Sequence, residues 1–250
     1  MSHTRKNLIP LTGISTSYEK KRKPGQYWDV EVFKACADVP EDFHQALVKL
    51  NELVAFNNGS LHIIDLYRTW EMQSEAREVY LKDKANTRKK NKKPFVAIPG
   101  GSFHNAARAV DIKLELLQFK GVPQADHLQF LWDIAKPLGF HPIIKIPDMH
   151  ASESWHFDFP GKDWQEAYDT LSYSETAKCC TLDIGGWDPA EVEETTRKMF
   201  VQAQLIRLGF YEIGKVDGIF GPKTKKVLDF CCDTEFDTKT LADVLARRTR

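Results

Sequence analysis

The chain has 250 residues, of which 42% are hydrophobic, and its formal net charge is +0. This length accommodates one large domain or two smaller ones, and the apolar content supports a packed core. The absence of net positive charge argues against a nucleic-acid-binding protein that works by neutralising phosphates. No apolar run reaches the length of a membrane-spanning helix, so no membrane span is predicted.

Residues 1–26 are expected to form an extended, solvated arm, because they combine prolines and glycines with the basic run 20–23. A charge run of this kind is usually a solvated surface, although it could also attach the chain to an anionic wall polymer. The N-terminus lacks the apolar core of a signal peptide. We therefore expect a protein that is made without an export signal of its own.

Residues 27–171 are predicted to form an α+β domain with a small antiparallel sheet and flanking helices. Helices are expected where apolar residues recur at helical spacing, and strands where short apolar or alternating runs occur. The predicted helices cover 42–58, 71–84 and 126–138. The predicted strands cover 61–67, 110–114, 140–146 and the run that begins at His156.

The stretch Ser102–Asp111 carries one imidazole, His104, and one carboxylate, Asp111. Strand alternation would turn Val110 and Ile112 into a core and Asp111 the opposite way, into an open site, with His104 on the loop leading in. A neutral imidazole nitrogen and a carboxylate oxygen are good ligands for zinc. Two ligands do not complete a zinc site, so a third is needed.

The third ligand is expected in the stretch Glu153–Phe159, where His156 stands in an aromatic, apolar run. A catalytic zinc has three protein ligands, an open position for water and a nearby base. We therefore predict one zinc ion bound by His104, Asp111 and His156, with Glu153 as the base. Residues three apart on a regular strand face opposite sides, so Glu153 must lie in a turn or bulge before the strand begins.

Three other histidines are weaker candidates. His141 and His150 compete for the role of third ligand, but neither has the aromatic strand context of His156. His62 is expected to be a satisfied residue of its strand.

The pattern of residues 102–111, followed by that of 153–156, resembles the signature of the VanY-type zinc D-alanyl-D-alanine carboxypeptidases. That wider group also contains dipeptidases and phage endolysins that cut peptidoglycan stem peptides. The similarity extends upstream to 67–73 and covers about 45–161 in all. The family usually has glycine where this chain has Ala107, a change that adds one methyl group near the site.

The resemblance implies roles for four further side chains. Arg68, at the end of a predicted strand, could stabilise negative charge on the attacked carbonyl oxygen or clamp a substrate carboxylate; the alternative is a surface salt bridge. Gln73 is a candidate to reach the site. Ser102 would donate a hydrogen bond to the bound peptide, unless it only serves a turn. Trp155, beside the metal, would combine core packing with substrate contact.

Residues 172–187 look like a linker, because they have few periodic apolar positions and contain two adjacent glycines. The five cysteines include two adjacent pairs, 179–180 and 231–232, and none has the spacing of a metal knuckle. Adjacent cysteines bond each other only with strain, so we expect reduced thiols. A bond between the two pairs is the alternative.

Residues 188–250 are predicted to form a three-helix domain. A capping box at 188–191 opens the first helix, and Pro222 opens the second. The pattern of 205–211 together with 217–224 is similar to that of the small three-helix peptidoglycan-binding domains. This resemblance implies attachment to the cell wall.

The sequence thus predicts a monomeric, two-domain zinc peptidase whose partner and substrate is bacterial peptidoglycan. Both removal of a terminal D-alanine and endopeptidase cleavage within the stem or cross-link fit the sequence. Action at the wall without a signal peptide implies release in the manner of a phage lysin, or an unrecognised export route. The alternatives are a non-catalytic wall-binding protein that keeps zinc as structure, and a cytosolic D,D-dipeptidase.

Overall fold

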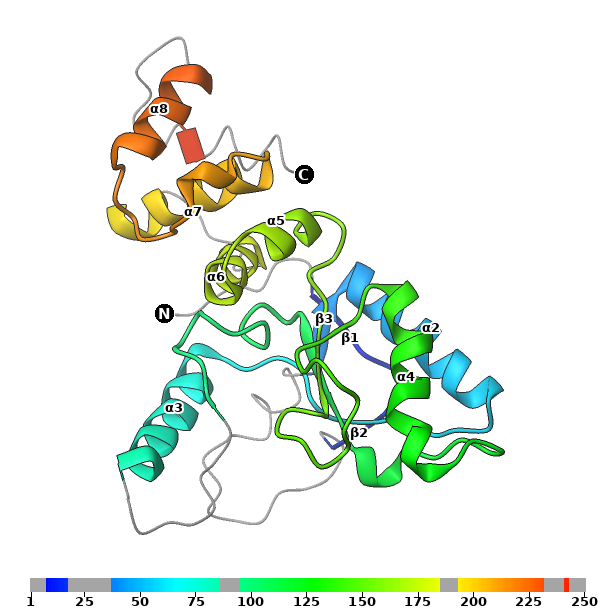
Figure 1. The fold of residues 1–250 in the computed structure, drawn as a ribbon. Helices are drawn as coiled ribbons and strands as arrows, with labels where there is room; N and C mark the ends of the chain where they lie inside the picture. The colour runs from blue at the N-terminus through cyan, green and yellow to red at the C-terminus, as the bar shows by residue number, and fades with distance from the viewer. Residues whose placement is uncertain (1–7, 18–36, 86–94, 185–192, 232–240, 243–250) are drawn as a thin grey trace.

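The computed structural model describes residues 8–17, 37–85, 95–184, 193–231 and 241–242. They form an α+β protein in which helices flank a small sheet, as the sequence predicted (Figure 1). The strands are β1 (Leu8–Pro10), β2 (Ser15–Thr16), β3 (Asp38–Pro40), β4 (His62–Asp65), β5 (Ala109–Ile112), β6 (His141–Pro142) and β7 (His156–Asp158). The helices are α2 (Glu41–Phe56), α3 (Trp70–Ala85), α4 (His127–Ala135), α5 (Gln165–Thr170), α6 (Tyr173–Ile184), α7 (Glu194–Arg207) and α8 (Pro222–Cys231). Short 3-10 turns cover Leu114–Leu116, Gln124–Asp126, Lys136–Leu138 and Tyr211–Ile213.

The main sheet has five strands in the order β2-β4-β5-β7-β6. Adjacent strands in this sheet run antiparallel, as predicted, except that β2 is parallel to β4. A separate pair joins β1 to β3. The prediction that 1–26 is a solvated arm is wrong for the part that the structure describes, because β1 and β2 pair with other strands and Ile14 and Thr16 are buried. The rest of that arm lies outside the described residues.

The two faces of the sheet have different tasks. Val110 and Ile112 of β5, with Phe157 of β7, belong to a core that includes the buried faces of α2 and α4, two helices that lie side by side in Figure 1. The alternate residues, Asp111 and His156, point to the opposite face, as strand geometry requires. This opposite face is covered rather than open, since only 5% of Asp111 is exposed.

The predicted helices of the N-terminal domain are confirmed with small shifts at their ends. The first, α2, begins after Pro40 with Glu41 and Asp42 in its first turn, where negative charge is favourable. Another, α4, continues as a 3-10 turn and ends at Gly139, whose φ of 93° suits a residue without a side chain. The predicted strand at 140–146 is shorter, because only His141–Pro142 pairs with β7.

The segment predicted as a linker, 172–187, contains the helix α6 (Tyr173–Ile184). Its apolar face was overlooked because most of it is made of small or weakly hydrophobic residues. The buried residues of α6 are Thr176, Ala177, Cys179, Cys180 and Leu182. Cys179 and Cys180 are free thiols, as predicted for that pair, and they act as small core residues.

The helix α6 packs against α7, so the C-terminal helices share a core with the peptidase domain. Asp183 of α6 accepts hydrogen bonds from Trp164 Nε1 (3.3 Å) and Arg207 Nη1 (3.1 Å). Glu175 of α6 accepts one from the backbone N–H of Val216 (2.7 Å). In the described residues, the C-terminal unit is therefore docked on α6 and is not a separately packed module.

In the C-terminal unit, α8 begins at Pro222, as predicted, and α7 ends before Gly209 (φ 97°). The capping box expected at 188–191 lies outside the described residues, and α7 begins only at Glu194. Of the third predicted helix, 238–248, the structure describes only residues 241–242, which are helical and buried. No helix in the described part of the chain is both long enough and apolar enough to span a membrane.

Candidate metal centre

Three buried side chains from separate segments bring their donor atoms together on the covered face of the sheet. His104 Nε2 lies 3.2 Å from Asp111 Oδ1 and 3.2 Å from His156 Nδ1, and His156 Nδ1 lies 2.9 Å from Asp111 Oδ1. These are the three residues that the sequence predicted as ligands, and they form a group that could hold a metal ion.

The donor set fits a small divalent cation. Ligands about 2.0 Å from a tetrahedral zinc ion are separated from each other by roughly 3.3 Å. The observed separations of 2.9–3.2 Å are close to that edge length. Two imidazoles and one carboxylate also leave a fourth position for another ligand, the arrangement typical of a catalytic site.

Strand register and one tight turn produce this convergence. Asp111 of β5 is directly opposite His156 of β7, so both side chains leave the sheet at the same level. His104 sits in a single helical turn, in which Asn105 N donates to Ser102 O and Ala107 N to His104 O. Ala107 closes this turn with a φ of 51°, which explains why a glycine is favoured there; for alanine this conformation costs about 1–2 kcal/mol.

Hydrogen bonds orient both imidazoles with one nitrogen free for a metal. His104 Nδ1 donates to the carbonyl oxygen of Leu66 (2.5 Å), which leaves Nε2 as the donor to the ion. His156 Nε2 donates to Asp158 Oδ1 (2.9 Å), which leaves Nδ1 for the ion. Carboxylates and carbonyls commonly fix metal-binding histidines in this way and raise their basicity.

Charges and burial shift the pKa values of the ligands. Burial would raise the pKa of Asp111, but the charges and hydrogen bonds of His104 and His156 outweigh it and hold this pKa well below its usual range. Burial would lower the pKa of His156, but Asp158 and Asp111 outweigh it and raise this pKa to about 10. In the absence of metal, His156 therefore carries a proton at neutral pH.

Glu153 meets the geometric condition that the sequence set for it. It lies in the turn before β7 with a φ of 65°, and its carbonyl oxygen accepts a hydrogen bond from His156 N (3.1 Å). The turn lets its side chain line the same cavity as His104 and His156. Partial burial raises the pKa of its carboxyl group.

The cavity at these residues has a volume of about 330 Å³. The predicted residues Arg68, Gln73 and Ser102 line it together with His104 and His156. Arg68 is held by Asp65 Oδ2 (2.7 Å) and approaches Asp111 Oδ2 (3.4 Å), so it is more than a surface salt bridge.

Gln73 and Ser102 also support the backbone around the cavity. Gln73 Nε2 donates to Ala97 O (2.9 Å), and Ser102 Oγ accepts from His104 N (3.3 Å). Two larger hollows, of about 890 and 1200 Å³, lie elsewhere on the chain, and neither is lined by any of the three candidate ligands. The smaller cavity is therefore the candidate active site, because it is the one lined by His104, His156 and Glu153.

Comparison with protein families places about half of the chain in a known family. The model of the family VanY, D-alanyl-D-alanine carboxypeptidase, matches residues 37–162, which is half of the chain and contains all of the predicted metal ligands. This chain belongs to the VanY family. Comparison with curated proteins found no match. Among solved structures, that of the LdcB LD-carboxypeptidase aligns with 68% of this chain and 77% of its own, at 17% identity and a TM-score of 0.46.

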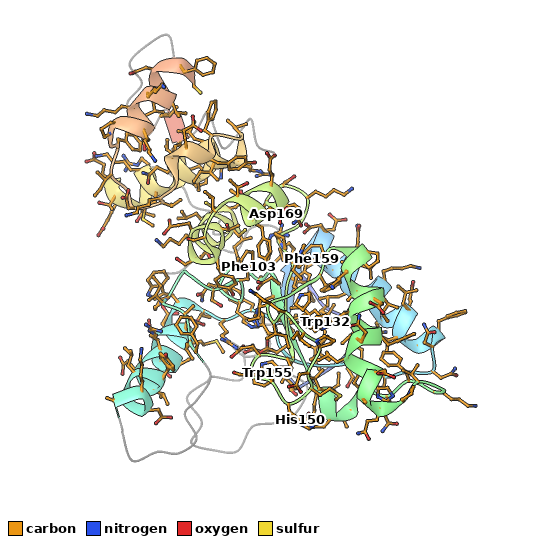
Figure 2. All side chains as sticks on the ribbon, in the orientation of Figure 1. Phe103, Trp132, His150, Trp155, Phe159 and Asp169 are labelled. Atoms are coloured by element: carbon orange, nitrogen blue, oxygen red, sulfur yellow. The ribbon has the colours of Figure 1, made fainter. Side chains whose placement is uncertain are left out.

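Within this VanY-family chain, Trp155 packs against the core, as predicted, but it does not line the metal cavity, where substrate contact was also expected. It packs against the core on the other face of the sheet and lines the 890 Å³ hollow, not the metal cavity. Figure 2 draws it with His150 toward the lower edge of the domain, away from Phe103, the neighbour of His104. Trp155 comes directly before β7, and its carbonyl oxygen accepts a hydrogen bond from Ile112 N of β5 (2.9 Å), so the alternation of the strand extends to it and it faces away from His156.

The other histidines have partners that remove them from the site, as expected. His62 contacts the hydroxyls of Ser15 (2.7 Å) and Ser17 (3.1 Å). His141 contacts Gln165 Oε1 (2.9 Å), and His150 is exposed.

Sequence reasoning missed four side chains that support the VanY-family site. Asp158, two positions after His156 on β7, is on the same face, a relation that strand alternation could have revealed. Asn105 joins two loops, since its Nδ2 donates to Arg68 O (2.9 Å) and its Oδ1 accepts from Gly100 N (3.0 Å). Nothing in the sequence around the two tyrosines of the α5–α6 region indicated that they would lie near the site. Tyr168 donates to Asp158 Oδ2 (2.9 Å), and Tyr173 lines the cavity.

Metal binding to this site is expected to release the proton of His156. With Zn²⁺ as the probe, the apparent affinity should rise about tenfold per pH unit between about pH 6 and 9, because this pKa of about 10 lies above that range. Chelator-competition titrations across the range would measure the slope. Asp158→Asn removes the negative charge that contributes most to raising the pKa of His156, so the affinity of this variant for Zn²⁺ should depend less steeply on pH. A flat slope in the native chain, or equal slopes in both proteins, would contradict this account.

Proposed function

We propose that this chain is a zinc peptidase that hydrolyses peptide bonds in the stem peptides of bacterial peptidoglycan. The observation that carries the proposal is the convergence of the donor atoms of His104, Asp111 and His156 beside Glu153 and Arg68, in a chain of the VanY family. Zinc is the ion proposed because two imidazoles, one carboxylate and short donor separations match its preferences.

His104 Nε2, Asp111 and His156 Nδ1 would hold the ion. When bound there, zinc would polarise the carbonyl of the scissile bond and lower the pKa of a water molecule. Asp158 and the carbonyl oxygen of Leu66 keep the two imidazoles in the required orientation.

Glu153 is the proposed general base. Its carboxylate would take a proton from the attacking water and pass it to the leaving amine. The turn at its positive φ brings this carboxylate into the cavity, and burial raises its pKa, which makes the carboxylate a stronger base than an exposed one. A purely structural metal site would have no use for such a group, so Glu153 favours an enzyme over a non-catalytic wall-binding protein.

Arg68 is the proposed partner of negative charge in the cavity. The guanidinium could stabilise the charge that develops on the carbonyl oxygen during attack, or bind a substrate carboxylate. Its hydrogen bond to Asp65 fixes it in place before substrate arrives, so little reorganisation is needed during the reaction.

Glu153→Gln is expected to retain zinc and to lower hydrolysis by about 10²–10⁴-fold, because the amide cannot take a proton. The substrates are a soluble stem pentapeptide ending in D-alanyl-D-alanine and purified sacculi. Mass spectrometry of the products measures the rate and identifies the bond, which separates carboxypeptidase from endopeptidase cleavage. Glu115→Gln, an exposed site away from the cavity, is the matched control. Hydrolysis by Glu153→Gln at the native rate would refute the mechanism.

We further propose that the C-terminal unit holds the enzyme on the wall, so that it acts at the bacterial cell wall and not as a cytosolic dipeptidase. Among the residues of this unit that the structure describes, three large apolar side chains are exposed, Leu208, Ile219 and Phe230, the last by 80%. Apolar side chains exposed in this way suit contact with a ligand. Attachment would raise the local concentration of the catalytic domain at its substrate.

Substitution of Ile219 and Phe230 by serine tests wall attachment without deleting the unit, whose removal would expose the buried face of α6. Co-sedimentation with purified sacculi should weaken by roughly tenfold, since apolar contacts are lost. Hydrolysis of the soluble pentapeptide should stay at the native rate. Unchanged co-sedimentation would exclude these side chains as wall contacts.

A further inference from the structure

The helix α6 supplies one wall of the metal cavity. Its first residue, Tyr173, lines the cavity together with Arg68, Glu153 and His156. The residue as a whole is 36% exposed. It also lies beyond residue 162, where the match to the family ends, so the family pattern assigns it no role.

Packing fixes the ring of Tyr173 in this position. Its edge meets the ring of Phe103, the buried neighbour of His104, with centroids 5.3 Å apart. Further along α6, Thr181 Oγ1 donates to the carbonyl oxygen of Gly100 (3.3 Å), on the loop that leads to His104. The opposite face of α6 is buried against α7. A ligand in the cavity would thus meet an ordered phenol.

Asp158, which the hydroxyl of Tyr173 contacts, does not need this hydroxyl as a donor. Its distance to Asp158 Oδ1 is 3.5 Å, longer than the usual 2.7–2.8 Å of a hydroxyl hydrogen bond. Asp158 already accepts shorter bonds from His156 (2.9 Å) and Tyr168 (2.9 Å). The O–H of Tyr173 can therefore turn to another acceptor at little cost.

The surroundings also keep this phenol protonated and place it near Arg68. Burial, and then the charge of Asp158, raise the pKa of Tyr173 well above its ordinary value, so the hydroxyl stays a donor. Arg68 lines the same cavity as Tyr173. Two hydrogen-bond donors thus serve one region of the cavity.

We infer that Tyr173 binds the substrate directly, donating a hydrogen bond to an oxygen atom of the peptide in the part of the cavity that Arg68 lines. This inference rests on the proposed function, because it takes a peptide as the ligand. The C-terminal unit then contributes to the substrate site as well, since its packing holds α6 in place.

Tyr168 provides a matched control for the competing explanation, in which Tyr173 only supports Asp158. Both residues are tyrosines that approach the same carboxylate. Tyr168 makes the shorter contact but does not line the cavity. If the tyrosines only support Asp158, loss of the Tyr168 hydroxyl should have the larger effect. If Tyr173 contacts the peptide, only loss of the Tyr173 hydroxyl should weaken peptide binding.

The experiment measures two affinities in the full-length Glu153→Gln protein, which cannot turn over its ligand. Isothermal titration at saturating Zn²⁺ gives the Kd of the soluble stem pentapeptide, and chelator competition gives the affinity for Zn²⁺. Adding Tyr173→Phe should weaken peptide binding by about threefold to tenfold, the loss of one hydrogen bond, with Zn²⁺ affinity within about twofold of the parent. Adding Tyr168→Phe should weaken Zn²⁺ binding and leave the peptide Kd unchanged.

Two results would overturn the inference, and they are distinguishable. If the parent protein binds the pentapeptide and Tyr173→Phe binds it equally well, Tyr173 does not contact the substrate, while the proposed function stands. If the parent protein binds no stem peptide at all, the proposed function fails and the inference fails with it.

Discussion

The pairing of β5 with β7 is the constraint on which the site depends, because it places Asp111 directly opposite His156. On the other face of the same strands, Val110 and Phe157 are fully buried in the core beneath α2 and α4. A slip of one residue in this register would expose these apolar side chains and turn the ligands into the core. Hydrophobic packing thus determines where the metal ligands point, and His104 needs only one tight turn to join them.

A second layer makes the buried charges tolerable. Asp158 is fully buried, and a carboxylate in that position is costly unless donors surround it. His156, Tyr168 and, more distantly, Tyr173 supply those donors. The tyrosines come from the α5–α6 region, which also packs against α7. In the described residues, the candidate metal site, its supporting carboxylate and the C-terminal unit are therefore connected by direct packing.

The ligands could be predicted from the sequence because their chemistry is local: an imidazole and a carboxylate near a strand, then a histidine preceded by a glutamate. The long helices could be predicted because their apolar residues recur regularly. What failed depended on contacts distant in sequence. The buried face of α6 includes Cys179 and Cys180, which do not form a recognisable apolar stripe in the sequence. Their place in a core becomes evident only from the packing of α7 against α6. Trp155 was assigned to the site by nearness to His156, although adjacent strand residues face apart.

Anomalous diffraction at the zinc absorption edge, from crystals of the full chain grown with Zn²⁺, tests the central claim most directly. The account predicts one strong peak about 2.0–2.2 Å from His104 Nε2, His156 Nδ1 and an oxygen of Asp111. The Glu153 side chain should be close to the ion without binding it. A principal zinc peak at any other group of residues, with these three side chains unoccupied, would contradict the account.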